Sequence, residues 1–209
     1  MGDVLPMFPL GTVLVPSAGL PLHVFEPRYR ALVHDCLQGG REFGVVLIAR
    51  GSEVGGGDVR TDVGTVARIL DAVELSDGRW ALGTVGLRRV RITRWLPDDP
   101  YPLAEVEDWP DPAPSTEMGD ALEACVSLVR RALGLAAEAG DATAPATIEL
   151  SDDPVLASYQ AAAVAPIGAF DRQRLLAADS PDVRVALLAE LARDAIAVLE
   201  LRLGGADGG

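Results

Sequence analysis

The stretch GLPLHVFEPRYRALV, residues 19–33, gathers a histidine, a glutamate and two arginines beside apolar residues. Side chains of these types act as general acids or bases where a partner carboxylate or histidine lies within hydrogen-bond reach. The sequence places no such partner beside Glu26. We therefore expect Glu26, Arg28 and Arg30 to hold the architecture, with a polar rim that recognises a ligand as the alternative.

A second polar group, His34-Asp35-Cys36, has the composition of a nucleophilic thiol with its base. Residues i and i+2 on a helix point to different sides, so His34 and Cys36 cannot share a proton in line. Cys125 lies far away in the sequence and neither cysteine belongs to a CxxC pair, which leaves no zinc-site spacing and no disulfide framework. We expect two buried thiols, no catalytic residue, no metal site and no cofactor.

The basic residues exclude several chemistries, because all 18 of them are arginines and lysine is absent from the sequence. A phosphate-binding loop of the GxxxxGK[ST] type, a Schiff base and a Ser-Lys protease dyad all require a lysine. The GxSxG elbow of serine hydrolases is also absent from the sequence. We therefore expect a protein that is not an enzyme.

The segment LRRVRITR, residues 87–94, is the one local cluster of positive charge. Arginines on a strand could bind RNA phosphates, and the candidates are Arg88, Arg89, Arg91 and Arg94. The formal net charge of −13 repels nucleic acid, however. The favoured interpretation is a strand whose arginine stems cover apolar surface and pair with neighbouring carboxylates, and nucleic acid is not an expected partner.

Residues 1–109 have the pattern of a β domain. Apolar and β-branched runs separated by glycine or proline clusters predict strands at 12–15, 20–25, 43–48 and 63–75. Asp77-Gly78 then predicts a tight turn into further strands over 79–96 and 101–109. Many short strands that close on themselves predict a barrel.

One helix interrupts these strands. Pro27 suits a first helical position, Glu26 a capping position and Gly39-Gly40 a helix end. Between them an apolar stripe with helical spacing runs through Tyr29, Leu32, Val33, Cys36 and Leu37. We expect this helix to pack on the barrel with Cys36 in the core.

The remainder of the chain is predicted to be helical and more acidic. Residues 110–116 form a proline-rich linker, residues 117–203 a helical subdomain and residues 204–209 a disordered tail. Helices are expected at 116–139, from Pro154, at 169–178 and from Pro181. The buried face of the last one is predicted to contain Leu187, Leu188, Leu191 and Val198. Residues 1–109 carry 11 Arg against 15 acidic residues (−4), and the rest carry 7 against 16 (−9).

The sequence indicates a cytoplasmic protein. Its first residues contain an acid and two early prolines instead of a basic leader, so a secretory signal is not expected. Apolar runs stay shorter than the ~20 residues that a membrane span needs, so a membrane partner is not expected either.

Several motifs in order resemble a known family. They are LPMFPLGTVLVPSAGLPLHVFEPRYRALVHDCL, FGVVLI, GTVARI, GLRRVRI, YPLAEVE and, near the end, FDRQRLLAADSPDVRVALLAELARD. Together they resemble the N-terminal substrate-binding domain of the Lon ATP-dependent proteases, and the resemblance covers nearly the whole chain. The most specific part is LPLHVFEPRYR, residues 20–30.

The resemblance implies an α+β fold, a PUA-like antiparallel β-barrel with one inserted helix followed by a small α-helical bundle. It also implies a binding role, because in Lon this domain engages protein substrates before an attached ATPase and a Ser-Lys protease act. The chain thus resembles a stand-alone Lon N-terminal domain protein, and an adaptor role in proteolysis or quality control would fit. Expected partners are unfolded or exposed apolar protein segments and a separate protease. The binding groove is expected between the barrel and the helices. The candidate peptide-binding residues are His23, Phe25, Glu26, Arg28, Tyr29 and Arg30.

Overall fold

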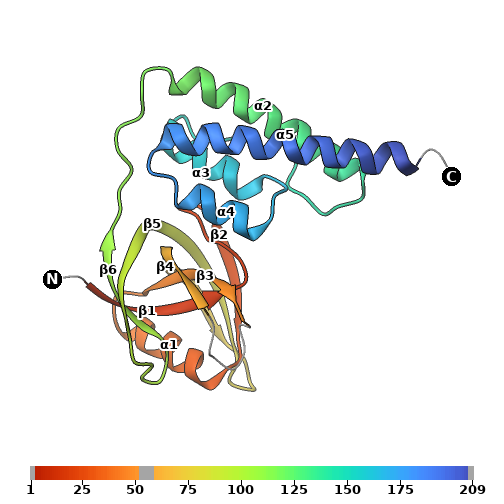
Figure 1. Ribbon diagram of the computed structural model, residues 1–209. Helices are drawn as coiled ribbons and strands as arrows, with labels where there is room; N and C mark the ends of the chain where they lie inside the picture. Colours follow the sequence, from red (N-terminus) through yellow and green to blue (C-terminus); the bar gives the residue numbers. More distant parts are fainter. Residues whose placement is uncertain (1–2, 52–58, 207–209) are drawn as a thin grey trace. The chain divides into compact units, whose positions relative to one another are not determined.

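Two compact units make up the chain in the computed structural model shown in Figure 1, which describes residues 3–51 and 59–206. The first unit ends at Pro110 and the second begins at Asp111. Among the described residues, the first unit contains all the strands and one helix, and the second contains the other helices. The predicted α+β class is confirmed.

A closed ring of strands forms the first unit. Its elements are β1 (Asp3–Leu10), β2 (Gly19–Val24), α1 (Pro27–Gln38), β3 (Glu42–Arg50), β4 (Val59–Glu74), β5 (Trp80–Leu96) and β6 (Leu103–Asp108). The ring runs β5-β4-β3-β1-β6 and closes because β6 also pairs with the second half of β5. Strand β2 lies beside the first half of β5. The long β5 therefore pairs with β2 along its first half and with β6 along its second half (Figure 1).

One pairing in the ring is parallel, which corrects the expectation of a wholly antiparallel barrel. Strands β1 and β3 run in the same direction, with Met7 opposite Gly44 and Leu10 opposite Leu47. Parallel neighbours need a crossover connection of a dozen or more residues. The segment that carries β2 and α1 provides this crossover, so the helix is part of the connection that makes the parallel pairing possible.

The first strand lies earlier than predicted. The strand is Asp3–Leu10, despite Pro6 and Pro9, and the predicted strand at 12–15 does not form. Residues Val13, Leu14 and Val15 are nevertheless buried. The Thr65 hydroxyl donates a hydrogen bond of 2.6 Å to the Leu14 carbonyl oxygen, so this irregular segment packs by its backbone against the ring.

Helix α1 has the predicted extent, but the side chain before its first residue makes a different contact from the predicted one. Pro27 occupies the first turn and Gly39 follows the last residue, as the sequence predicts. The Glu26 side chain makes no capping hydrogen bond, so its predicted role as cap acceptor is wrong. Its carboxylate instead accepts from Arg28 Nε at 3.1 Å.

The core of the first unit contains the predicted stripe of α1. Tyr29, Leu32, Val33 and Cys36 are buried against β1, β2 and the neighbouring strands. The Phe8 and Tyr29 rings stack, with centroids 4.1 Å apart and planes inclined by 10°. Burial of this stripe fixes α1 beside the β1 and β2 residues that it contacts.

Up to Ala206, where the described residues end, the second unit contains four helices: α2 (Met118–Glu138), α3 (Pro154–Val164), α4 (Ala169–Leu176) and α5 (Pro181–Ala206). Asp153 caps α3 by accepting from the Leu156 N–H at 2.9 Å, and Ser180 accepts from the Val183 N–H at 3.2 Å at the start of α5. Met118, Leu122, Cys125, Val129 and Leu133 are buried as the stripe of α2 predicts. None of the helices in the described ranges is both long and apolar enough to cross a membrane.

Two expectations for α5 need correction. Val198, predicted to be buried, is 58% exposed, and Leu199 beside it is buried at 5% instead. The helix also continues to Ala206, so the predicted disordered tail does not begin at residue 204. Residues 207–209 of that tail lie outside the described residues.

Candidate functional site

A cavity of about 190 Å³ lies in the first unit where β1, β2 and the start of α1 meet. It is bordered by two residues of β1, four consecutive residues of β2, and the turn into α1. The lining residues are Phe8, Leu10, Pro21, Leu22, His23, Val24, Phe25, Glu26 and Tyr29. Phe25 and Glu26 lie in the turn between β2, which ends at Val24, and α1, which begins at Pro27. This turn places both residues in the lining of the cavity.

The cavity combines a buried apolar floor with an exposed rim. Phe8, Leu10 and Tyr29 are 7%, 6% and 3% exposed and form part of the floor. Phe25 is 56% exposed, and His23 is exposed on the strand face opposite Leu22 and Val24. An apolar pocket with a few polar groups at its edge is the usual form of a binding site.

Four of the six candidate residues line this cavity: His23, Phe25, Glu26 and Tyr29. Tyr29 contributes as a core residue, stacked on Phe8, and not as part of an exposed rim. Arg28 adjoins the lining, because it contacts the Glu26 carboxylate and its guanidinium carbon lies 4.5 Å from the centre of the Tyr29 ring. Its position fixes the orientation of Glu26 at the rim.

Arg30 lies elsewhere. Its guanidinium packs against Gly78 in the turn between β4 and β5, where a Cβ on residue 78 would overlap the Arg30 side chain. Gly78 has φ of 77°, the left-handed conformation that glycine adopts without strain. Arg30 thus supports the β4–β5 turn rather than the cavity, which agrees with the architectural interpretation of this residue.

The other side of the cavity was not among the predicted site residues. Phe8 and Leu10 belong to β1, the strand that was not predicted. The available signal was the apolar run in DVLPMFPL, which the two prolines interrupt.

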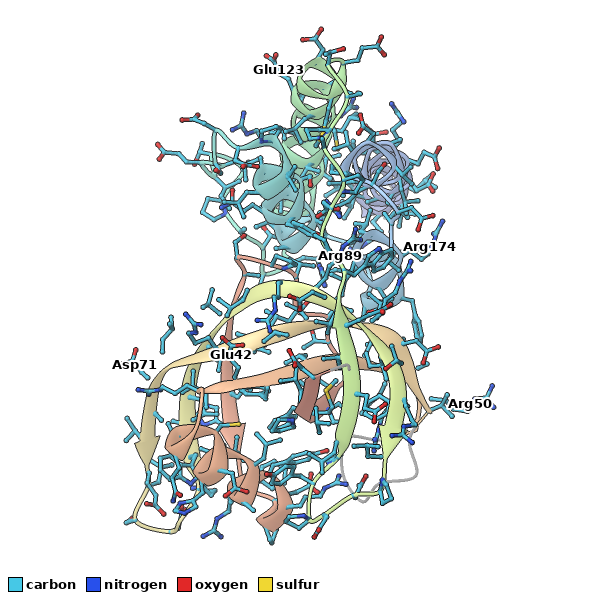
Figure 2. The ribbon with its side chains drawn as sticks, turned by 90° about the vertical axis from the view of Figure 1, so that its left-hand side faces the viewer. Glu42, Arg50, Asp71, Arg89, Glu123 and Arg174 are labelled. Carbon is cyan, nitrogen blue, oxygen red and sulfur yellow. The ribbon has the colours of Figure 1, made fainter. Side chains whose placement is uncertain are left out.

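The arginines of residues 88–94 contact other residues of the first unit. Arg88 donates to Asp108 at 2.8 Å and to Glu42 at 3.0 Å, and Arg94 donates to both carboxylate oxygens of Glu105. Burial alone would raise the pKa of Glu42, but hydrogen bonds from Arg88 and Arg68 outweigh it and hold that pKa below its usual value. Figure 2 labels Glu42 on β3 and Arg89 on β5.

Arg89 and Arg91 both contact Trp109. Their guanidinium carbons lie 3.9 Å and 3.6 Å from the centre of the indole ring, and Arg89 Nε also donates to the Trp109 carbonyl oxygen at 2.9 Å. Arg89 is only 2% exposed. The cluster therefore resembles the expected carboxylate-paired strand more than a surface that presents four arginines to phosphates.

Neither thiol has the surroundings of a nucleophile. Cys36 is buried and its Sγ donates to the Glu42 carbonyl oxygen at 3.3 Å. His34 is exposed and contacts Gln38, one turn further along α1. Within the described ranges, no group of three or more His, Cys, Asp or Glu side chains could hold a metal ion.

Larger cavities of about 430 Å³ and 310 Å³ lie within the second unit. The first is lined by aliphatic, acidic and small side chains of α2, of the residues just before it and of α5, and the second by residues around Pro166 and the second half of α5. Aromatic side chains are missing from both sets of described lining residues. Because aromatic anchors contribute strongly to protein recognition, the smaller cavity beside α1 is the better candidate.

Comparison with known proteins connects the chain to one family. The family model described as the ATP-dependent protease La (LON) substrate-binding domain matches residues 4–194. Lon protease 2 of Herpetosiphon aurantiacus is 28% identical over 94% of this chain, which corresponds to 24% of that protease. Lon protease 2 of Sorangium cellulosum is 28% identical over 96% of this chain, which corresponds to 26% of that protease. The chain thus spans about a quarter of the length of these two relatives.

Solved structures show the same relationship. A Lon N-terminal domain protein from Xanthomonas campestris is 32% identical, with a TM-score of 0.65 over 89% of this chain and 96% of that one. The N-terminal domain of a Lon protease from the Mycobacterium avium complex has a TM-score of 0.67 at 16% identity, over 92% of this chain and 99% of that one. The second likeness concerns the fold alone.

Proposed function

The chain belongs to the ATP-dependent protease La (Lon) substrate-binding domain family, and from this premise we propose that it binds exposed apolar segments of unfolded proteins without catalysing a reaction itself. The cavity beside α1 carries the proposal. Its floor is apolar and aromatic, its rim presents Phe25 and His23 to solvent, and the Glu26–Arg28 pair borders it. Such a surface suits protein segments that are normally buried in their own folded state.

A binding role also agrees with the absence of lysine, because these 209 residues cannot form a lysine-dependent nucleotide loop or a Ser-Lys dyad. Delivery of the bound segment to a separate protease, as an adaptor in quality control, is part of the proposal. RNA binding has less support, because the arginines of residues 88–94 contact carboxylates and Trp109.

The test compares two exposed phenylalanines. Phe25 at the cavity is 56% exposed and Phe170 on α4 is 63% exposed, so neither replacement removes a buried side chain. We expect Phe25→Ala to weaken binding of reduced, carboxymethylated lactalbumin, a permanently unfolded protein, by roughly tenfold, the effect of losing an aromatic anchor. Fluorescence anisotropy of the labelled lactalbumin measures the dissociation constant.

Phe170→Ala is the matched control and should bind as the wild-type protein does. Equal binding by all three proteins would move the site away from the cavity. Absence of binding to unfolded lactalbumin by the wild-type protein would overturn the proposed function.

A further inference from the structure

Strand β2 is paired on one side only. Residues Gly19–Val24 pair antiparallel with β5 along their whole length, and among the described residues no other strand pairs with β2. A strand edge that is left unpaired presents backbone N–H and C=O groups that can pair with another chain.

The hydrogen-bond pattern shows which groups of β2 face outward. The Gly86 N–H donates to the Ala18 carbonyl oxygen at 2.9 Å, so residues 18 and 86 bond across the ladder. Alternation along an antiparallel ladder then directs the backbone groups of residues 20, 22 and 24 toward β5 and those of 19, 21 and 23 away from it. Pro21, which has no N–H to contribute, fits an outward position. The outer edge thus offers both backbone groups of Gly19 and, beside the cavity, the Pro21 carbonyl and both backbone groups of His23.

The cavity beside α1 lies along this same edge. Four consecutive residues of β2, from Pro21 to Val24, line it, although their side chains alternate between the two faces of the strand. No residue of β5 belongs to the lining, and the opposite border consists of Phe8 and Leu10 from β1. An unpaired backbone edge and an apolar pocket are therefore next to each other.

The size of the cavity suits a side chain better than a small molecule. Its volume of about 190 Å³ is below the roughly 300–1,000 Å³ of pockets that enclose a cofactor or a drug-sized ligand. In peptide recognition by strand addition, main-chain hydrogen bonds provide affinity and pockets beside the edge accept alternate side chains. The first unit has both features in one place.

We propose that an extended segment of an unfolded protein adds to the outer edge of β2 as a further strand and places one large apolar side chain in the cavity. This inference rests on the proposed function and specifies its substrate: segments of strand-forming residues, free of proline, with an aromatic or branched side chain. Recognition depends on the N–H of His23 and the carbonyls of Pro21 and His23, so it is largely independent of the rest of the segment's sequence.

Replacement of His23 by proline tests the backbone contact. His23→Pro removes the outward N–H, while the ladder to β5 keeps its hydrogen bonds because residue 23 does not donate to β5. His23→Ala removes the same side chain and keeps the N–H. The probe is a labelled, end-capped heptapeptide of sequence Thr-Val-Thr-Phe-Thr-Val-Thr, and its binding is followed by fluorescence anisotropy. We expect His23→Pro to bind it roughly fivefold to tenfold more weakly than His23→Ala does, as for loss of one hydrogen bond.

Two methylated forms of the peptide test the same contact on the wild-type protein, and they decide the question even if His23→Pro does not fold. One form carries N-methyl groups at odd positions and the other at even positions, so only one form loses the N–H groups that face β2. We expect one form to bind like the parent peptide and the other to fail. Binding also slows hydrogen exchange of the His23 amide, whereas the Leu22 amide is already bonded to β5 and serves as the internal control.

The outcomes separate this inference from the proposed function. Loss of binding by both methylated forms would indicate a helical bound segment, and equal binding by both would indicate side-chain recognition alone; either result overturns strand addition. Binding of unfolded lactalbumin without binding of the heptapeptide also overturns it and leaves the proposed function in place. Absence of binding to both probes overturns the proposed function itself.

Discussion

At the scale of single residues, burial lowers the reactivity of the two thiols. Burial raises the pKa of Cys36 to about 12, with a smaller contribution from the nearby Asp35 carboxylate. Burial likewise raises the pKa of Cys125 to about 11, although Arg193 acts in the opposite direction. A raised thiol pKa lowers the fraction of thiolate, which is the reactive form, at every pH below it.

We therefore predict that iodoacetamide at about pH 8 leaves both cysteines of the native protein unmodified over a period in which both react in guanidinium chloride, where the thiols regain ordinary values of about 8.5. Mass spectrometry of the intact protein gives the number of alkyl groups added. Modification of native Cys36 at the rate of the unfolded chain would contradict the assignment of this residue to the core.

The sequence predicted single residues well where one helical stripe decides the outcome and less well where a second element is involved. Burial of Tyr29 and Cys36 follows from their spacing in α1. The positions of Glu26 and Arg30 depend on Arg28 and on the β4–β5 turn near Gly78, respectively. Periodicity along one helix carries no information about such partners, so the cavity rim could be predicted only in part.

At the scale of elements, the irregular segment before β2 depends on a glycine in β5. Ser17 has φ of 67°, its N–H donates to the Gly86 carbonyl oxygen at 2.8 Å, and the Gly86 N–H bonds back to Ala18, the pattern of a bulge. A Cβ on residue 86 would overlap the Val15 carbonyl oxygen. The missing side chain lets the backbone at residues 13–15 approach the ring closely.

Gly86→Ala should accordingly destabilise the protein by roughly 1–3 kcal/mol, the range for overpacking in a closely packed site. Gly134→Ala is the matched control, because a Cβ there meets no atom within 4 Å and the residue lies inside α2. Alanine in a helix interior should stabilise by about 0.5–1 kcal/mol relative to glycine. Equilibrium unfolding in urea measures both changes, and two changes of the same sign would refute this account of Gly86.

The elements themselves were largely predictable, and the exceptions have physical reasons. The starts of α1, α3 and α5 follow from Pro27, Pro154 and Pro181, and Asp153 and Ser180 also cap α3 and α5. Strand β1 was missed because Pro6 and Pro9 argue locally against a strand. Tertiary pairing with β6 and β3 nevertheless holds this segment extended. Val13, Leu14 and Val15 are buried by packing and not by a ladder, which no local pattern distinguishes.

At the scale of the whole molecule, a buried ion pair holds the first residue of the second unit, Asp111. Arg184 of α5 donates to Asp111 at 2.6 Å, to the Ser158 hydroxyl at 3.0 Å and to the Leu175 carbonyl oxygen at 3.2 Å. The Tyr159 hydroxyl donates to the other Asp111 oxygen at 2.7 Å. The Arg184 side chain is 0% exposed and that of Asp111 is 11% exposed. Residue 111 was assigned to a linker, but these contacts tie it to α3 and α5.

Asp111→Ala leaves the buried guanidinium without its counter-ion, and we predict a loss of roughly 3–5 kcal/mol in the free energy of unfolding. Asp141→Ala is the control: it removes the partner of Arg202 in a pair whose side chains are 44% and 49% exposed, and it should change that free energy far less than Asp111→Ala does. Far-UV circular dichroism during urea unfolding follows the helices. Adding Arg184→Met to Asp111→Ala should recover part of the loss, because the uncompensated charge is then gone. Equal stabilities of the Asp111→Ala and Asp141→Ala proteins would show that the pair does not hold the chain to the helical unit.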